Sequence, residues 1–241
     1  MASPAGRQQR GPRGDFGTAT VEMRRYLVPL LDARREEPRD DLLTRLVEAE
    51  VDGERLNENE LLGFFQLLLL AGSETTTNLI NLAMLCLMEY AEERERVRAA
   101  SQLIPSTIEE VLRYRSPVQA VFRHATRDIP LHGQVIPRGS LVLPMLGSAN
   151  RDPRAFAVPD RFDVSRDPNP HIAFGHGPHF CLGAALSRLE ASIALEHLLS
   201  QLDDVQLVSD EPWQPREALH VHGPTSLPIR FRTRQAAAAM A

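Results

Sequence analysis

Apolar residues recur at helical spacing along the first part of the chain. In the segment 21–35 they repeat at intervals of three and four, which predicts a helix that ends before Pro38. A second helix is predicted over residues 40–48. Asn57 has Glu60 three residues later, the pattern of a capping box, so a third helix should begin there.

The longest apolar run of the sequence follows this cap, from Leu61 to Met88. If the whole run is helical it is about 40 Å long. The polar block 73–78 interrupts it well before the length that a bilayer requires, so a membrane span is excluded. A helix that is apolar on most sides is instead the central helix of a soluble core.

The second half of the chain alternates between helical and strand-like patterns. Residues 108–114 and 182–202 have helical spacing, whereas 120–146 reads as short strands around a His132-Gly133 turn. The segment 150–171 is rich in Pro and Asp and is predicted to be irregular. The expected fold class is therefore mainly α with small β-sheets, an α+β arrangement with the sheet at the edge of a helical body.

The amino-acid composition adds little to this fold prediction. Hydrophobic residues make up 43% of the chain and charged residues 24%, and the net charge of -5 gives no reason to expect nucleic acid. The two cysteines suggest no disulfide framework and fit a reducing cytoplasm. Residues 1–20 and 232–241 are expected to be disordered tails around one domain over 21–231.

A glycine-punctuated loop, Phe174 to Gly183, delivers Cys181 to the start of a predicted helix. Gly175 and Gly177 permit positive φ and a close approach of the backbone to a flat ligand. A helix N-terminus favours the thiolate over the thiol. Phe174 can shield the sulfur from water, and Gly183 leaves room for backbone or ligand. A shielded thiolate of this kind suits an iron ligand, in particular that of a haem.

Two alternatives remain for this loop. Cys181 could be a free cysteine buried beside a turn, since free cysteine usually behaves as a small core residue. It could also form a zinc site with His171, His176 and His179, because histidine and cysteine are ordinary zinc ligands. The spacing of these four residues is unusual for zinc, and a zinc site gives no reason for Phe174.

The loop pattern Phe-Gly-x-Gly-x-His-x-Cys-x-Gly resembles the haem-binding loop of cytochromes P450, in particular the soluble bacterial members. The resemblance implies a P450-like fold, haem b (iron protoporphyrin IX) with Cys181 as its axial ligand, and insertion of one oxygen atom of O2 into an organic molecule. It also implies electrons from a ferredoxin-type or similar partner, an apolar small-molecule substrate and no membrane anchor.

The polar block of the central helix, Ala71-Gly-Ser-Glu-Thr-Thr76, resembles the oxygen-binding groove of the same family. A threonine hydroxyl can bond to the carbonyl one turn earlier and bend a helix. By resemblance, Thr75 would steady bound oxygen and Glu74 would deliver protons. The alternative is a solvated polar turn on a bent helix.

Glu110 and Arg113 stand three residues apart on one predicted helix, and alone they would read as an exposed ion pair. Because Arg161 follows before the cysteine loop, the order resembles the P450 arrangement in which Glu110, Arg113 and Arg161 form a buried charge cluster. Buried charges are tolerated only when they are paired. The cluster is therefore expected to support folding and haem retention.

The resemblance also implies residues for the haem propionates. Arg123 and His179 would bind them, Arg123 through its two-pronged donor geometry; a surface arginine is the alternative. Phe174, Gly175 and Gly183 complete the expected cofactor-binding set. The resemblance also implies positions for the substrate pocket, which indicate only that it is apolar: residues 67–71 and 118–121, His220 and Val221.

The resemblance covers residues 21–231, whereas P450s are considerably longer, so the family's N-terminal part has no counterpart here. Two hypotheses follow. The chain is a haem-thiolate monooxygenase or its haem-bearing portion, or it is a truncated, inactive P450-like protein with weak or no haem binding.

Overall fold

The computed structural model describes residues 16–208, 213–215 and 218–234. They divide into two compact units, one ending at Leu70 and the other beginning at Ala71, and each unit is described by itself. The division falls within the long helix α3, Glu58–Glu89.

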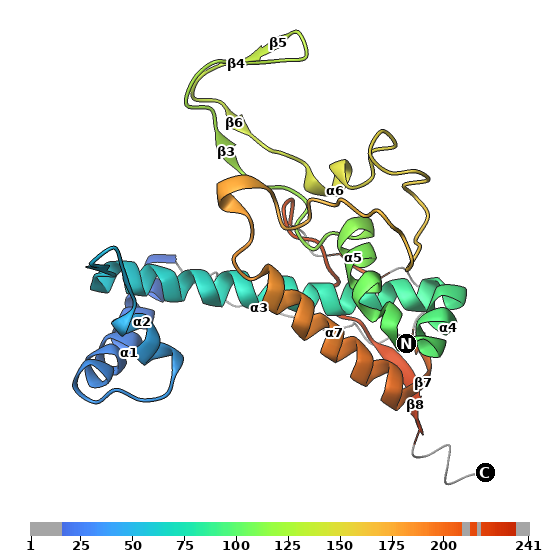
Figure 1. Cartoon of the computed structure of the whole chain (residues 1–241), viewed down its shortest axis with the longest axis horizontal. Helices are drawn as coiled ribbons and strands as arrows, with labels where there is room; N and C mark the ends of the chain where they lie inside the picture. The colour runs from blue at the N-terminus through green and yellow to red at the C-terminus, as the bar shows by residue number, and fades with distance from the viewer. Residues whose placement is uncertain (1–15, 209–212, 216–217, 235–241) are drawn as a thin grey trace, which may run out of the picture. The chain divides into compact units, whose positions relative to one another are not determined.

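The first unit contains helices α1 (Phe16–Glu36) and α2 (Leu42–Glu48), the short strands β1 (Glu50–Val51) and β2 (Glu54–Arg55), and the first part of α3 (Figure 1). Its core consists of Leu27, Leu31, Leu61, Leu62 and Phe65. Helix α1 begins at Phe16, so residues 16–20 of the expected tail are helical. Of the second expected tail, 232–241, residues 232 and 233 end a strand, Ile229–Thr233. Residues 1–15 and 235–241 of the two expected tails lie outside the described residues.

The predicted capping box at the start of α3 is confirmed. The Asn57 side chain accepts a hydrogen bond from Glu60 N, at 3.1 Å, and the Glu60 carboxylate accepts one from Asn57 N, at 2.8 Å. These two bonds satisfy donors that the first turn of a helix otherwise leaves open. The helix therefore begins where its sequence signal lies.

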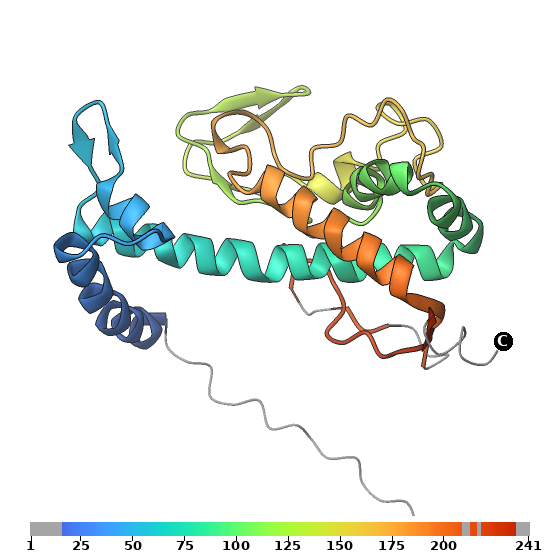
Figure 2. The same ribbon diagram turned by 60° about the horizontal axis from the view of Figure 1, so that its bottom comes forward.

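The second unit is built around the rest of α3. Its other helices are α4 (Ala91–Ala99), η1 (Ser101–Leu103), α5 (Ile104–Tyr114), α6 (Leu146–Ala149), η2 (Gly177–His179) and α7 (Ala184–Gln201). Helix α7 crosses α3 (Figures 1 and 2). The main core lies where α3, α5 and α7 meet, with Leu82, Leu85, Val111 and Leu195 almost fully buried.

The strands of the second unit form separate two-stranded ribbons. Strand β3 (Arg123–His124) pairs with β6 (Leu141–Val142), β4 (Ile129–Leu131) with β5 (Gln134–Ile136), and β7 (Leu202–Leu207) with β8 (Ile229–Thr233), all antiparallel. The 120–146 segment thus makes two ribbons instead of one continuous small sheet. The predicted class, mainly α with small sheets, is confirmed.

Over the described residues, every helix is too short or too polar to cross a bilayer.

Candidate functional site

The cysteine loop closes on itself through main-chain hydrogen bonds. Cys181 N donates to Phe174 O at 3.0 Å, and Phe180 N donates to Gly177 O at 2.9 Å. Gly175 and Gly177 have φ of 75° and 76°, in the region that favours glycine, as the sequence predicts. A residue with a Cβ at either position would strain the turn that presents Cys181.

Cys181 lies just ahead of α7. Gly183 is the N-cap of that helix, and Ala184 N bonds to Cys181 O at 3.3 Å. The cysteine side chain is exposed, which argues against the interpretation of Cys181 as a buried core residue. A Cβ added at Gly183 would meet no atom within 4 Å, so the surface beside the cysteine is open.

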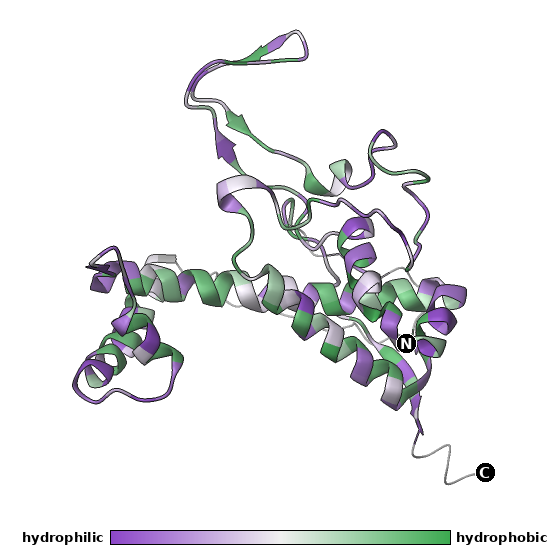
Figure 3. Cartoon of the chain, in the orientation of Figure 1, coloured by the Kyte–Doolittle hydropathy of each residue, from purple (hydrophilic) through white to green (hydrophobic). Residues whose placement is uncertain are grey.

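This open surface is apolar. Phe180 is 53% exposed and Leu182 76% exposed, on either side of the cysteine. Along α7 the exposed surface continues through Leu186, Leu189 and Ile193, whose spacing places them on one face. Figure 3 shows hydrophobic residues on this helix. Large apolar side chains at this exposure favour a covering group, a flat ligand or further protein.

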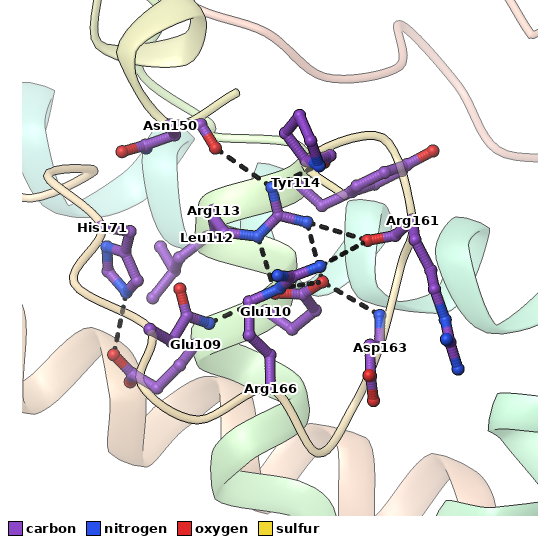
Figure 4. Close-up of polar contacts among 12 residues, drawn as sticks. Glu109, Glu110, Leu112, Arg113, Tyr114, Asn150, Arg161, Asp163, Arg166 and His171 are labelled. Carbon is purple, nitrogen blue, oxygen red and sulfur yellow. Dashed lines mark hydrogen bonds and ion pairs between the residues drawn. The ribbon is translucent and has the colours of Figure 1, made fainter. Parts of the chain in front are cut away.

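Behind the loop, the side chains of Glu110 and Arg113 are fully buried and form a two-pronged ion pair, with both N–O distances 2.8 Å. The remaining Arg113 donors reach the carbonyls of Asn150, Pro159 and Arg161 at 2.8–3.0 Å (Figure 4). A buried guanidinium with all these acceptors has its charge compensated, as burial requires. The hydrogen bonds of Arg113 therefore connect helix α5 to the irregular segment 150–171.

The third charged member of this cluster is Arg166, and the expectation that it is Arg161 is wrong. Arg161 contributes only its main-chain carbonyl, and its side chain is exposed. The Arg166 guanidinium bonds to both Glu110 oxygens, at 3.1 and 3.2 Å (Figure 4). Asp163 N also donates to Glu110, at 2.9 Å. The turn at 161–166 directs the later arginine inward.

The Asn150 side chain connects the two ends of the same irregular segment. Its buried side chain donates to Ser116 Oγ at 2.9 Å and accepts from Ile172 N at 2.8 Å. The start of the segment and Ile172, two residues before the cysteine loop, are thereby joined through one amide. The predicted irregular stretch is consequently a packed connection, fastened to α5 at several points.

On α3, the Thr75 hydroxyl donates to Ala71 O at 2.7 Å, the back-bond expected for this block. Thr77 makes the same contact with Ser73 O, at 2.8 Å. Thr76 bonds to Ser187 Oγ on α7 at 3.3 Å, which links the polar block to the helix that follows the cysteine. The Glu74 side chain is exposed.

The two expected propionate ligands both lie at the surface. Arg123 is exposed on β3 and bonds to Phe122 O, and His179 is exposed at the end of η2. Two of the segments expected to line a substrate pocket, 118–121 and 220–221, are paired: Val118 bridges Val221, and Gln119 N donates to His220 O at 2.8 Å. Sequence spacing alone gives no sign of this pairing across a hundred residues.

The zinc alternative is not supported. The described residues contain no group of three or more His, Cys, Asp or Glu side chains that could hold a metal ion. The buried His171 points its Nε2 at Glu109 instead, at 2.9 Å. In the part of the chain that the structure describes, Cys181 therefore stands without further His, Cys, Asp or Glu side chains placed to share a metal ion with it.

Sequence and structure comparisons agree with this geometry. The sequence model of the family "Cytochrome P450" matches residues 18–225. The chain is 46% identical over 214 residues to cytochrome P450 107B1 of Saccharopolyspora erythraea, covering 88% of this chain and 53% of that protein. It is 43% identical to the cytochrome P450 monooxygenase PikC of Streptomyces venezuelae, covering 89% and 52%. The chain belongs to the cytochrome P450 family.

Solved structures give the same result. The cytochrome P450 CYP109Q5 from Chondromyces apiculatus superimposes with a TM-score of 0.87 at 45% identity, covering 90% of this chain and 56% of that one. The chain therefore has the P450 fold over nearly all of its length. It spans about half the length of the relatives that it matches.

Proposed function

We propose that this chain carries the haem-ligand site of a monooxygenase, with Cys181 as the ligand. The observation that carries the proposal is the exposed cysteine on a closed loop with two positive-φ glycines, beside an open apolar surface. A thiolate in this setting is the iron ligand typical of monooxygenase haems. Membership of the family supports the assignment.

The residues around Cys181 fit haem b. The open surface beside Gly183 leaves room for a flat ring, and Phe180 and Leu182 would offer it apolar contact. Arg123 and His179 are exposed and could bind its two carboxylates. Phe174 and Gly175 would hold the loop in shape. When bound, the haem iron supplies the oxygen-activating chemistry of the site.

Within this proposal, two residues of α3 have separate roles: Thr75 steadies dioxygen and Glu74 delivers protons. The Thr75 hydroxyl donates a hydrogen bond to Ala71 O, and its oxygen can accept a further hydrogen bond. The Glu74 side chain is exposed to solvent, which supports its assignment to proton delivery. Replacing Thr75 by Ala should leave cofactor binding intact and reduce the fraction of oxygen consumption that yields product.

The partners belong to the same proposal. Electrons would come from a ferredoxin-type or similar donor, and the substrate would be an apolar small molecule. Relatives are named for tasks as different as cyclomarin C epoxidation and lipid ω-hydroxylation, so the family suggests no single substrate. A cytoplasmic location and a haem domain over 21–231 are also proposed, supported by two cysteines that form no disulfide.

A second candidate is a P450-like chain that binds haem weakly or not at all. The observation in its favour is the uncovered apolar face of α7, with Leu186 58% and Leu189 57% exposed, in a chain that spans about half of its relatives. Water at this face would weaken thiolate ligation.

The deciding experiment is the carbon monoxide difference spectrum of the reduced, haem-supplemented protein. A strongly red-shifted thiolate-type band that is lost in Cys181→Ala and kept in Cys86→Ala supports the proposed site. A thiolate-type band in Cys181→Ala would show that the ligand is misassigned. No haem uptake by the wild-type chain would favour the second candidate.

A further inference from the structure

A second ion-pair cluster is centred on Glu109, the residue before Glu110 in the sequence. It is not part of the cysteine-loop motif, and the proposed chemistry does not use it. Glu109 on α5 binds Arg188 on α7 with both carboxylate oxygens, at 2.6 Å to Nε and 3.0 Å to Nη2. The same carboxylate contacts His171 Nε2 at 2.9 Å. Because Ala173 N donates to His171 Nδ1, Nε2 carries the proton and donates to Glu109.

The pairing is strong enough to keep Glu109 ionised. Burial opposes the charge, but hydrogen bonds from His171 and Arg188 outweigh it and lower the pKa of Glu109 to about 2. A bidentate contact between guanidinium and carboxylate also fixes the plane of the arginine. The orientation of Arg188 is therefore set by Glu109.

Held in this plane, Arg188 lies over the ring of Phe174, with the guanidinium carbon 4.5 Å from the ring centroid. Phe174 opens the cysteine loop, and its carbonyl accepts the hydrogen bond from Cys181 N at 3.0 Å. A cation over an aromatic face is an attractive contact. The Arg188 guanidinium thus contacts Phe174, the residue whose carbonyl closes the loop at Cys181.

The charge of Arg188 is secured by the same partner. The pKa of Arg188 is raised, first by its hydrogen bond to Glu109, so the guanidinium over the Phe174 ring stays a cation.

We propose that Arg188 is a positioning residue for Cys181. Clamped by Glu109, it holds the ring of Phe174, the residue whose carbonyl accepts the hydrogen bond from Cys181 N. The role in ligation rests on the proposed haem-thiolate function, whereas the role in loop geometry exists without cofactor.

The test compares Arg188→Gln, Arg188→Lys and Glu109→Gln with a matched control. Arg115→Gln is suitable, because Arg115 also pairs with a glutamate, Glu89 at 2.8 Å, and stacks 5.7 Å from the Trp213 centroid. Hydrogen exchange of the peptide 174–183 is measured in the cofactor-free protein, together with thermal unfolding of the whole chain.

Arg188→Gln should speed exchange of that peptide about tenfold, and the control should leave it unchanged at a similar loss of thermal stability. Lysine keeps the charge without the flat fork, so Arg188→Lys should not restore the loop. Glu109→Gln should give an intermediate increase. Equal loop exchange in Arg188→Gln and Arg115→Gln would overturn the proposal.

The cofactor-loaded protein gives a second readout. If wild type forms the thiolate-type complex, Arg188→Gln should convert part of it to a thiol- or histidine-type band and shift the midpoint potential. An unchanged band and potential would overturn the role in ligation while leaving Cys181 as the ligand. If wild type binds no haem, the exchange experiment still decides the positioning role.

Discussion

The two sides of the cysteine loop differ in how far their side chains are buried and paired. Behind it, Glu110 and Arg113 are fully buried, and their charges and hydrogen bonds are matched by partners from α5 and the segment 150–169. In front of it, Phe180, Leu182 and Cys181 are exposed. The polar groups that would support the proposed ligand are thus paired within this chain, whereas the apolar face proposed to receive the cofactor is exposed. Substitutions in the buried cluster should therefore change the stability of the protein, and substitutions at the exposed face should change the proposed ligation.

The largest effect is expected at the centre of the buried side. Glu110→Ala leaves the Arg113 guanidinium buried without its carboxylate, which should lower the free energy of unfolding by about 3–5 kcal/mol. Urea unfolding followed by far-UV circular dichroism measures the change. A loss below 1 kcal/mol, within the range of a surface ion pair, would contradict the buried cluster.

Arg166 and Arg161 provide a matched pair for the corrected cluster. Arg166→Ala removes two bonds to Glu110 and should cost about 2 kcal/mol, whereas Arg161→Ala removes an exposed side chain and should stay within about 0.5 kcal/mol. The same unfolding assay compares them. A larger loss for Arg161→Ala would restore Arg161 as the charged partner.

Acid should reduce the contribution of Glu109 to stability. Its folded-state pKa of about 2 lies below the ordinary value of 4.5, so its contribution to stability is complete above pH 4.5 and is lost as the pH falls toward 2. Between pH 5.5 and 3, wild type should lose about 1 kcal/mol more than Glu109→Gln, because partial exposure screens the pair. Parallel stability curves for the two proteins would contradict this.

The smallest effect on stability is expected on the open side. Cys181→Ala should change the free energy of unfolding by less than about 0.5 kcal/mol, since the side chain is exposed.

The two cysteines should differ in reactivity, because Cys86 is buried and Cys181 is exposed. Burial raises the pKa of Cys86 to about 12, so iodoacetamide at pH 8 should modify Cys181 and spare Cys86 in the native protein. Mass spectrometry of tryptic peptides reads both sites, and unfolded protein, labelled at both, is the control. Labelling of native Cys86 would contradict its burial.

Local signals in the sequence predicted local structure well. The cap at Asn57, the positive φ at Gly175 and the back-bond of Thr75 follow from neighbours within four residues. Partners distant in sequence were harder to predict. Arg161 and Arg166 both precede the loop, and only the path of the turn decides which guanidinium reaches Glu110.

The same reasoning explains the residues that the sequence did not reveal. Glu109 and Arg188 are separated by 79 residues, and each alone reads as a surface charge on a helix. Their pairing depends on how α5 packs against α7. Likewise, the division of the chain near Leu70 falls inside one continuous helical pattern, so periodicity gives no boundary there.

The contacts of Glu110 also bear on how the chain is made. Its partners in the irregular segment lie 53, 56 and 59 residues further on. At about 5–20 residues per second, a ribosome needs several seconds to supply them after α5 has emerged. During that interval the glutamate and its arginine cannot be buried without cost. The support behind Cys181 can therefore be completed only as synthesis reaches the cysteine loop itself.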